Sequence, residues 1–191
     1  MSPPTGAAIF AVVLVLVIGG FIVLTSYNAI VALRQRIDKA WANIDVVLKQ
    51  RHDQLPNLVA AVRGLMAYEQ GVLTRVTELR AAYTPTAPIP DQAATSEATS
   101  AAVRSLFAVV ERYPDIKAQA NVLDLQDQIE RLEAMIADRR ELYNDQVYRY
   151  NTTIKQFPGA LLAPFFGWRP REFFAADAAD SVRPDTDLRT T

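Results

Sequence analysis

Few residues of this chain have the types and the spacing that catalysis or metal binding needs. His52 is the single histidine and cysteine is absent, so the usual ligands of a zinc site and a histidine-based nucleophilic relay are missing. Glu130 and Glu133 lie off the apolar stripe of their predicted helix, which favours a solvated helix face over an acid–base pair. The sequence contains no glycine-rich phosphate loop. We therefore expect no catalytic, cofactor-binding or metal-binding residues, and a protein that is not an enzyme.

A dense group of aromatic and basic residues lies between Phe157 and Phe174. Trp and Phe at the depth of the lipid headgroups, with arginines that meet anionic lipid, form an interfacial membrane anchor. Alternatively, the aromatic side chains fold back and complete the core of the domain. The membrane-interface candidates are Tyr27, Phe165, Phe166, Trp168, Arg169, Arg171, Phe173 and Phe174.

Five polar residues lie beside apolar helical stripes, namely Asn43, Asp45, Asn57, Asn144 and Asn151. Asn144 and Asn151 are seven residues apart and therefore share one helix face. Polar residues at the edge of a helical core fix the register of the helices by pairing across them. A polar groove for a partner or a small ligand is the alternative interpretation.

An uncharged segment occupies residues 6–24, GAAIFAVVLVLVIGGFIVL, and the first charged side chain after it is Arg34. At 1.5 Å per residue this segment spans about 28 Å, close to the thickness of a bilayer's hydrocarbon core. Residues 1–5 lack Lys and Arg, and no small-x-small cleavage site follows the segment, which favours an uncleaved anchor over a signal peptide. We predict a transmembrane helix over residues 6–26.

The charges around this span predict its orientation. No Lys or Arg precedes the span. Five cations follow it closely: Arg34, Arg36, Lys39, Lys49 and Arg51. The positive-inside rule then places the N-terminus outside and the rest of the chain in the cytoplasm. We expect a single-pass protein of the bacterial inner membrane.

The remaining chain has helical periodicity throughout, with apolar residues three and four positions apart. The stripes predict helices over about 27–51, 54–82, 97–112 and 115–157, followed by an aromatic segment over 158–174 and a disordered polar tail over 175–191. Asp53 is expected to cap the second helix with Pro56 in its first turn, and three prolines make 83–96 a loop. The fold class is all-α: a transmembrane helix that continues, from about Ala7 to Arg51, into an antiparallel up-and-down four-helix bundle with long helices over 27–174.

Three motifs closely resemble those of the LemA family of single-span bacterial membrane proteins. They are YNAIVALRQRIDKAWANIDVVLKQRHDQLPNLV at Tyr27–Val59, YNDQVYRYNTTIKQFP at Tyr143–Pro158 and FGWRPREFF at Phe166–Phe174. The resemblance implies a membrane-anchored helical bundle. It implies little chemistry, because the family has no well-established activity; its members are tied to envelope stress, protease partners or membrane-organelle formation.

These features favour an adaptor or organising module that holds partner proteins at the membrane. One alternative is a self-assembling scaffold that shapes the bilayer, since Gly19 and Gly20 with Ala8 and Ala11 permit close packing of spans. Another is an envelope-stress or signalling accessory protein. Expected partners are membrane lipid, unidentified proteins and further copies of the chain. Nucleic acid is not expected, because the formal net charge is −1.

Overall fold

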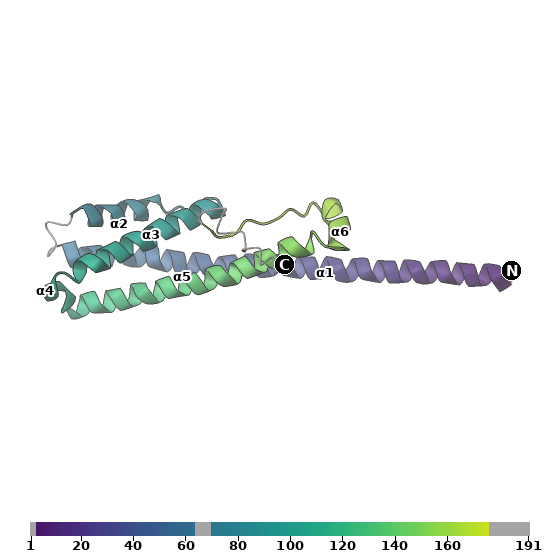
Figure 1. Ribbon diagram of the computed structural model, residues 1–191, viewed down its shortest axis with the longest axis horizontal. Coiled ribbons are helices and arrows are strands. Elements are labelled where there is room, and N and C mark those ends of the chain that lie inside the picture. Colours follow the sequence, from purple (N-terminus) through teal and green to yellow (C-terminus); the bar gives the residue numbers. More distant parts are fainter. Residues whose placement is uncertain (1–2, 64–69, 176–191) are drawn as a thin grey trace, which may run out of the picture. The chain divides into compact units, whose positions relative to one another are not determined.

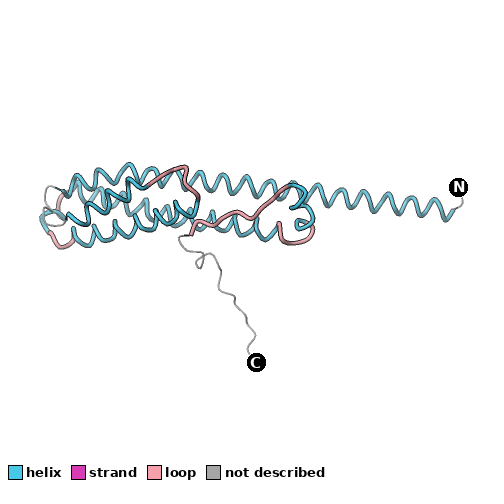
Figure 2. The backbone as a smooth tube through the Cα atoms, turned by 90° about the horizontal axis from the view of Figure 1, so that it is seen from above, coloured by secondary structure: helices cyan, strands magenta, loops and turns pink. Residues whose placement is uncertain are grey.

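The structure is a computed structural model that describes the backbone of residues 3–63 and 70–175. Side chains are described for residues 6–62 and 70–175. Within these ranges the chain forms six helices and no strand (Figures 1 and 2). The all-α prediction is confirmed. The prediction of disorder for 175–191 falls, from residue 176 onward, outside the described residues.

Helix α1 runs from Pro3 to Arg63, a single helix of 61 residues that includes Pro56 in its interior (Figure 1). The predicted boundary between residues 51 and 54 is therefore wrong. An interior proline costs about 3 kcal/mol because it removes one hydrogen bond and crowds the preceding turn. Leu55, Leu58 and Val62 are each at most 1% exposed around it, and burial of such side chains contributes about 1.5–3 kcal/mol apiece. Tertiary burial thus outweighs the local cost.

Helices α2 (Gln70–Ala82) and α3 (Ile89–Val110) follow and pack against each other. Helix α3 begins inside the stretch 83–96 that was predicted to be a loop. Pro88 occupies its N-cap and Pro90 its first turn, where a missing N–H costs little. The buried side of its first turns carries Gln92, Ala93 and Ser96. Because these residues are small or polar, they leave no apolar stripe in the sequence.

The predicted helix over 115–157 is two helices, α4 (Pro114–Lys117) and α5 (Ala120–Thr153). The aromatic segment contains a further helix, α6 (Gly159–Phe166), that the periodicity did not predict. Gly159 packs against the backbone of Thr153, where a Cβ atom would overlap the carbonyl oxygen. This close approach allows the chain to turn directly from the end of α5 into α6.

Two compact units divide the chain. Unit 1 contains Met1–Lys39 and Asp145–Arg171. It therefore holds the first part of α1, the end of α5, and α6. Unit 2 contains Ala40–Asn144 and Glu172–Thr191. In unit 2 the later part of α1 and the first part of α5 accompany α2 and α3 (Figure 1). The helical bundle is thus present, while the antiparallel up-and-down arrangement of four helices remains a prediction. The buried core of unit 1 comprises Ile30, Ile37, Val147, Tyr150, Ile154, Leu162, Ala163 and Trp168.

Candidate functional site

The first part of α1 is apolar and exposed. Its large apolar side chains from Ile9 to Leu24 are 40–70% exposed. An 18-residue window of the helix has a mean hydropathy of 3.1 with none of it buried inside the protein. Within the described residues, this is the one helix long and apolar enough to cross a membrane. A continuous exposed apolar surface of this length matches the hydrocarbon core of a bilayer.

An aromatic cluster in unit 1 joins α1 to the segment around α6. Tyr27, three residues beyond Leu24, lies with its ring centroid 4.9 Å from that of Phe166 and 5.7 Å from that of Trp168. Phe166 and Trp168 stack on each other at 5.0 Å. Gly167, with a φ of 63°, ends α6 in the left-handed conformation, and the Trp168 N–H donates to the Ala163 carbonyl at 2.9 Å. This turn brings both aromatic rings onto Tyr27.

The outward face of α6 is also apolar. Leu161 and Phe165, four residues apart in the helix, are 61% and 87% exposed, and Phe157 in the turn before the helix is 78% exposed. Leu162 and Ala163, on the opposite side, are buried. The short helix therefore has one face in the protein and one unpartnered apolar face.

The other predicted interface residues divide into buried and exposed groups. Trp168 is 8% exposed and Phe174 only 2% exposed, so neither side chain offers the lipid contact that was predicted for it. In unit 2, the ring centroids of Phe174 and Trp41 are 5.8 Å apart. Asn144 of α5 holds the backbone of Phe174 through hydrogen bonds to its N–H and carbonyl. Phe173 is half-buried and Arg169 is exposed, while Arg171 Nη2 lies 3.5 Å from Asp38 Oδ1.

Asn144 and Asn151 both hold the extended C-terminal segment against α5, rather than a second helix. Asn151 Oδ1 accepts from the Arg171 N–H at 2.8 Å, and its Nδ2 donates to the Arg171 carbonyl at 2.9 Å. Asn144 makes the same pair with Phe174, at 2.8 Å and 3.2 Å. The spacings agree, because seven helical residues and three extended residues both advance by about 10 Å.

The remaining polar candidates do not gather in one place. Asp45 accepts a hydrogen bond from the Tyr83 hydroxyl at 3.3 Å. Burial, followed by the nearby Asp45 carboxylate, raises the pKa of Tyr83 to about 12. Asn57 is exposed and donates to Gln54 of its own helix at 3.1 Å, and Asn43 is exposed.

A buried ionic centre in unit 2 was not predicted. Arg51 is 4% exposed and donates to Ser100 Oγ at 2.9 Å, to Ser96 Oγ at 2.9 Å and to Glu133 Oε1 at 2.8 Å. Ser100 Oγ in turn donates to Glu133 Oε2 at 2.5 Å. The centre joins α1, α3 and α5.

The assignment of Glu133 to a solvated face is therefore wrong, since its side chain is only 26% exposed and ion-paired. The spacing held a partial signal. Arg51 sits between Leu48 and Leu55 on the apolar stripe, and Glu133, beside its own stripe, follows Ile129 by one turn. These positions indicate that each charge lies near the core, but only the fold shows that the two side chains meet.

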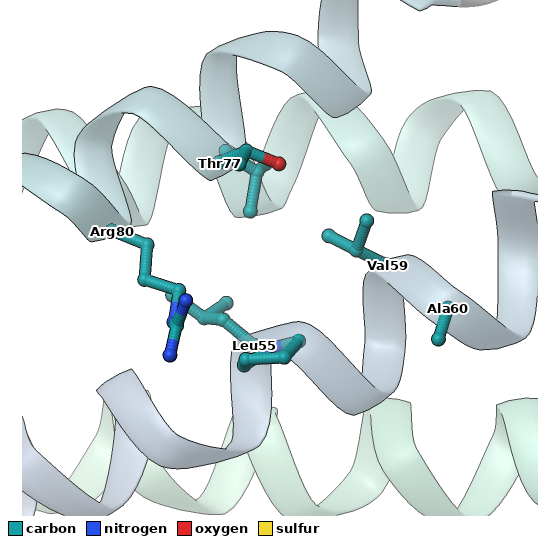
Figure 3. A pocket seen from close by; sticks show the side chains of 7 residues that line it. Leu55, Val59, Ala60, Thr77 and Arg80 are labelled. Carbon is teal, nitrogen blue, oxygen red and sulfur yellow. The ribbon is translucent and has the colours of Figure 1, made fainter.

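An open groove between α1 and α2 has a volume of about 460 Å³ (Figure 3). Its walls are Leu55, Pro56, Val59, Ala60, Val76, Thr77 and Arg80. Arg80 extends from α2 toward Leu55 of α1 (Figure 3). The lining holds no carboxylate or histidine, and the described residues contain no group of three His, Cys, Asp or Glu side chains placed to hold a metal ion. The lining of the groove is suited to apolar contact and has no side chain that could act as a general acid or base near neutral pH.

An exposed apolar helix segment joined to a packed helical region defines the class of membrane-associated helical proteins. The chain belongs to the LemA family, whose sequence profile matches residues 40–187. It is also similar to two proteins of Paramagnetospirillum magneticum, magnetosome protein MamQ 1 and magnetosome protein MamQ 2. Each is 36% identical over 73 residues, which cover 38% of this chain and 27% of the relative. The match thus spans about a quarter of the length of these curated relatives.

Proposed function

We propose that this protein is a non-catalytic adaptor that holds partner proteins at the bacterial inner membrane. The observation that carries the proposal is the composition of α1. One helix supplies both the exposed apolar segment over residues 6–24 and buried core residues of unit 2, such as Ile44, Leu48 and Leu55. A helical domain built on its own membrane anchor is suited to present its surface beside the bilayer.

The groove between α1 and α2 supports protein binding. Five apolar residues, one threonine and one arginine line it, and apolar surface with an arginine is what protein interfaces favour. The exposed groove position Ala60 is suited to a photo-reactive amino acid. Glu130 on α5 is an exposed control outside the groove.

Cross-linking in cells tests the adaptor. A photo-reactive residue at Ala60 is expected to capture a distinct protein in a discrete complex, whereas one at Glu130 captures little. The mass of the full-length protein in mild detergent, measured by light scattering with detergent subtracted, is expected to be that of a monomer. Capture of only this chain at Ala60, together with a large discrete particle, would refute the adaptor.

A self-assembling membrane scaffold is the second candidate. The similarity to two proteins named as magnetosome proteins supports it, together with the membrane-organelle roles that the family resemblance implies. Gly19 and Gly20 in the apolar segment lack side chains, and small residues of this kind allow helices in a membrane to approach closely. The same light-scattering measurement separates the two candidates, since a scaffold gives a large particle of defined mass.

A further inference from the structure

We propose that α6 and the turn before it form a second membrane contact: an interfacial helix that inserts Leu161 and Phe165, together with the preceding Phe157, among anionic phospholipids beside the transmembrane segment. The inference rests on the anchoring by α1 in the proposed function. It adds a lipid-binding surface that is separate from the span and uses different residues from the groove.

The first argument is the apolar face itself. Leu161 and Phe165 lie four residues apart in α6, so they project from one side of the helix, and Phe157 lies in the turn before it; each of the three is more than 60% exposed. Ala160 and Pro164, which lie between them, are exposed as well. A contiguous apolar face of this kind on a short helix is what partitions into the headgroup region of a bilayer.

The second argument is continuity with the transmembrane segment. The contacts of Tyr27 with Phe166 and Trp168 attach the end of α6 to α1 only three residues beyond Leu24, where the continuously apolar segment gives way to Thr25 and Ser26. An aromatic residue at that position lies at the membrane–water interface. In unit 1, therefore, α6 is held at the level where the apolar core of the bilayer gives way to headgroups.

The third argument is charge. Residues 1–39 and 145–171 contain seven cations and two acids, whereas the rest of the sequence has thirteen cations and nineteen acids. Both acids of unit 1 are already paired, Asp38 with Arg171 at 3.5 Å and Asp145 with Arg149 at 2.8 Å. Five cations have no acidic partner among the described residues: Arg34, Arg36, Lys39, Lys155 and Arg169. This excess complements phosphatidylglycerol and similar anionic lipids.

Site-directed spin labelling of the full-length chain tests the proposal directly, because the chain has no cysteine of its own. Phe165→Cys carries the nitroxide, in nanodiscs that hold one copy each and contain phosphatidylglycerol with phosphatidylcholine. Molecular oxygen partitions into lipid, whereas a water-soluble nickel complex stays in the aqueous phase. We expect the label at position 165 to be readily relaxed by oxygen and to be less accessible to the nickel complex than a water-exposed label is. A nickel accessibility as high as that of a water-exposed site would overturn the proposal.

Two matched positions define the scale. Leu142→Cys replaces a side chain that is 61% exposed on α5 in unit 2 and is expected to report water. Leu16→Cys replaces one that is 69% exposed in the span and is expected to report lipid. If Leu16 reports water, the anchor of the proposed function fails; if Leu16 reports lipid and Phe165 reports water, only the inference about α6 fails. One copy per disc excludes burial of Phe165 by a second copy.

The double variant Lys155→Glu/Arg169→Glu tests the lipid charge. Both side chains are exposed and neither forms an ion pair within the described residues. The Phe165 label in this background is expected to regain nickel accessibility in the anionic nanodiscs. Unchanged accessibility would remove the preference for anionic lipid and leave the apolar face as the sole basis of insertion.

Discussion

At the scale of residues, Arg51 shows how a charge can be buried inside a small helical domain. Its guanidinium makes three short hydrogen bonds, and the carboxylate of Glu133 neutralises it within 2.8 Å. A buried charge is tolerated only when it is both paired and hydrogen-bonded. The centre therefore depends on all of its members, and the loss of one leaves the others uncompensated.

Replacing Arg51 with alanine is expected to lower the free energy of unfolding by about 3 kcal/mol, because Glu133 keeps its charge without a partner. Denaturant unfolding of the protein in detergent, followed by circular dichroism, measures the loss. The double variant Arg51→Met/Glu133→Leu should recover most of it, since an apolar pair needs no compensation. Arg75→Ala is the control: it breaks an ion pair with Glu78 that is 60% exposed at both ends and should cost less than about 1 kcal/mol.

Tyr83 predicts a dependence of stability on alkaline pH. Its pKa is raised from 10.0 to about 12, chiefly by burial and then by Asp45, so the folded protein favours the neutral phenol. The corresponding stability is complete below pH 10 and is lost as the pH rises toward 12. Ultraviolet titration of the phenolate should show one late-titrating tyrosine that disappears in Tyr83→Phe. Titration of that tyrosine at its ordinary pKa would contradict the burial of its hydroxyl.

At the scale of elements, the extended segment after α6 is held by side chains rather than by a neighbouring strand. Each of Asn144 and Asn151 supplies one donor and one acceptor to a backbone position of that segment. Tyr150 adds a bond from its hydroxyl to the Arg169 carbonyl at 3.1 Å. The end of α5 thus replaces the hydrogen bonds that a sheet would otherwise provide.

Asn151→Ala is expected to release this segment locally. Both bonds to Arg171 are lost together, at a cost of about 1–3 kcal/mol for the backbone groups left unpaired. Hydrogen exchange at the Arg171 amide should accelerate markedly, because that N–H donates to Asn151 Oδ1. Asn43→Ala removes an exposed asparagine and should leave the same amide protected. Equal exchange rates in the two variants would refute the role of Asn151.

Pro56 is a second element-level test, since it interrupts the hydrogen bonding of α1 without ending the helix. Pro56→Ala is expected to raise the free energy of unfolding by up to about 3 kcal/mol, as alanine restores the missing N–H and suits a helix interior. Thermal unfolding in detergent measures the gain. A lower stability would mean that the proline ring contributes more in the wall of the groove than it costs in the helix.

At the scale of the whole molecule, the charge is unevenly distributed between the two units, positive in unit 1 and negative in the rest of the sequence. Arg34, Arg36 and Lys39 follow the apolar segment within one helix. The positive-inside rule acts on cations close to the end of a span. On this ground we propose a cytoplasmic location for the residues after the apolar segment.

Thiol labelling in cells tests that orientation. Leu142→Cys places a single reactive thiol at an exposed site of unit 2. A membrane-impermeant maleimide should label it only after the inner membrane is permeabilised, because a cytoplasmic thiol is otherwise shielded. Labelling in intact spheroplasts would reverse the proposed orientation.

The sequence by itself determined the helical class and the apolar segment, because both follow from local patterns. A spacing of three and four defines an amphipathic helix, and nineteen uncharged residues define a candidate span. The LemA motifs likewise lie in contiguous stretches, and the family profile over residues 40–187 confirmed the family.

Only the tertiary structure decided which residues face each other. Trp168 and Phe165 belong to the same aromatic segment, but one packs on Tyr27 and the other points outward, 87% exposed. The continuation of α1 through Pro56 and the pairing of Arg51 with Glu133 depend on side chains brought together by folding. Burial and partnership are set by residues distant in the chain, and no local pattern contains that information.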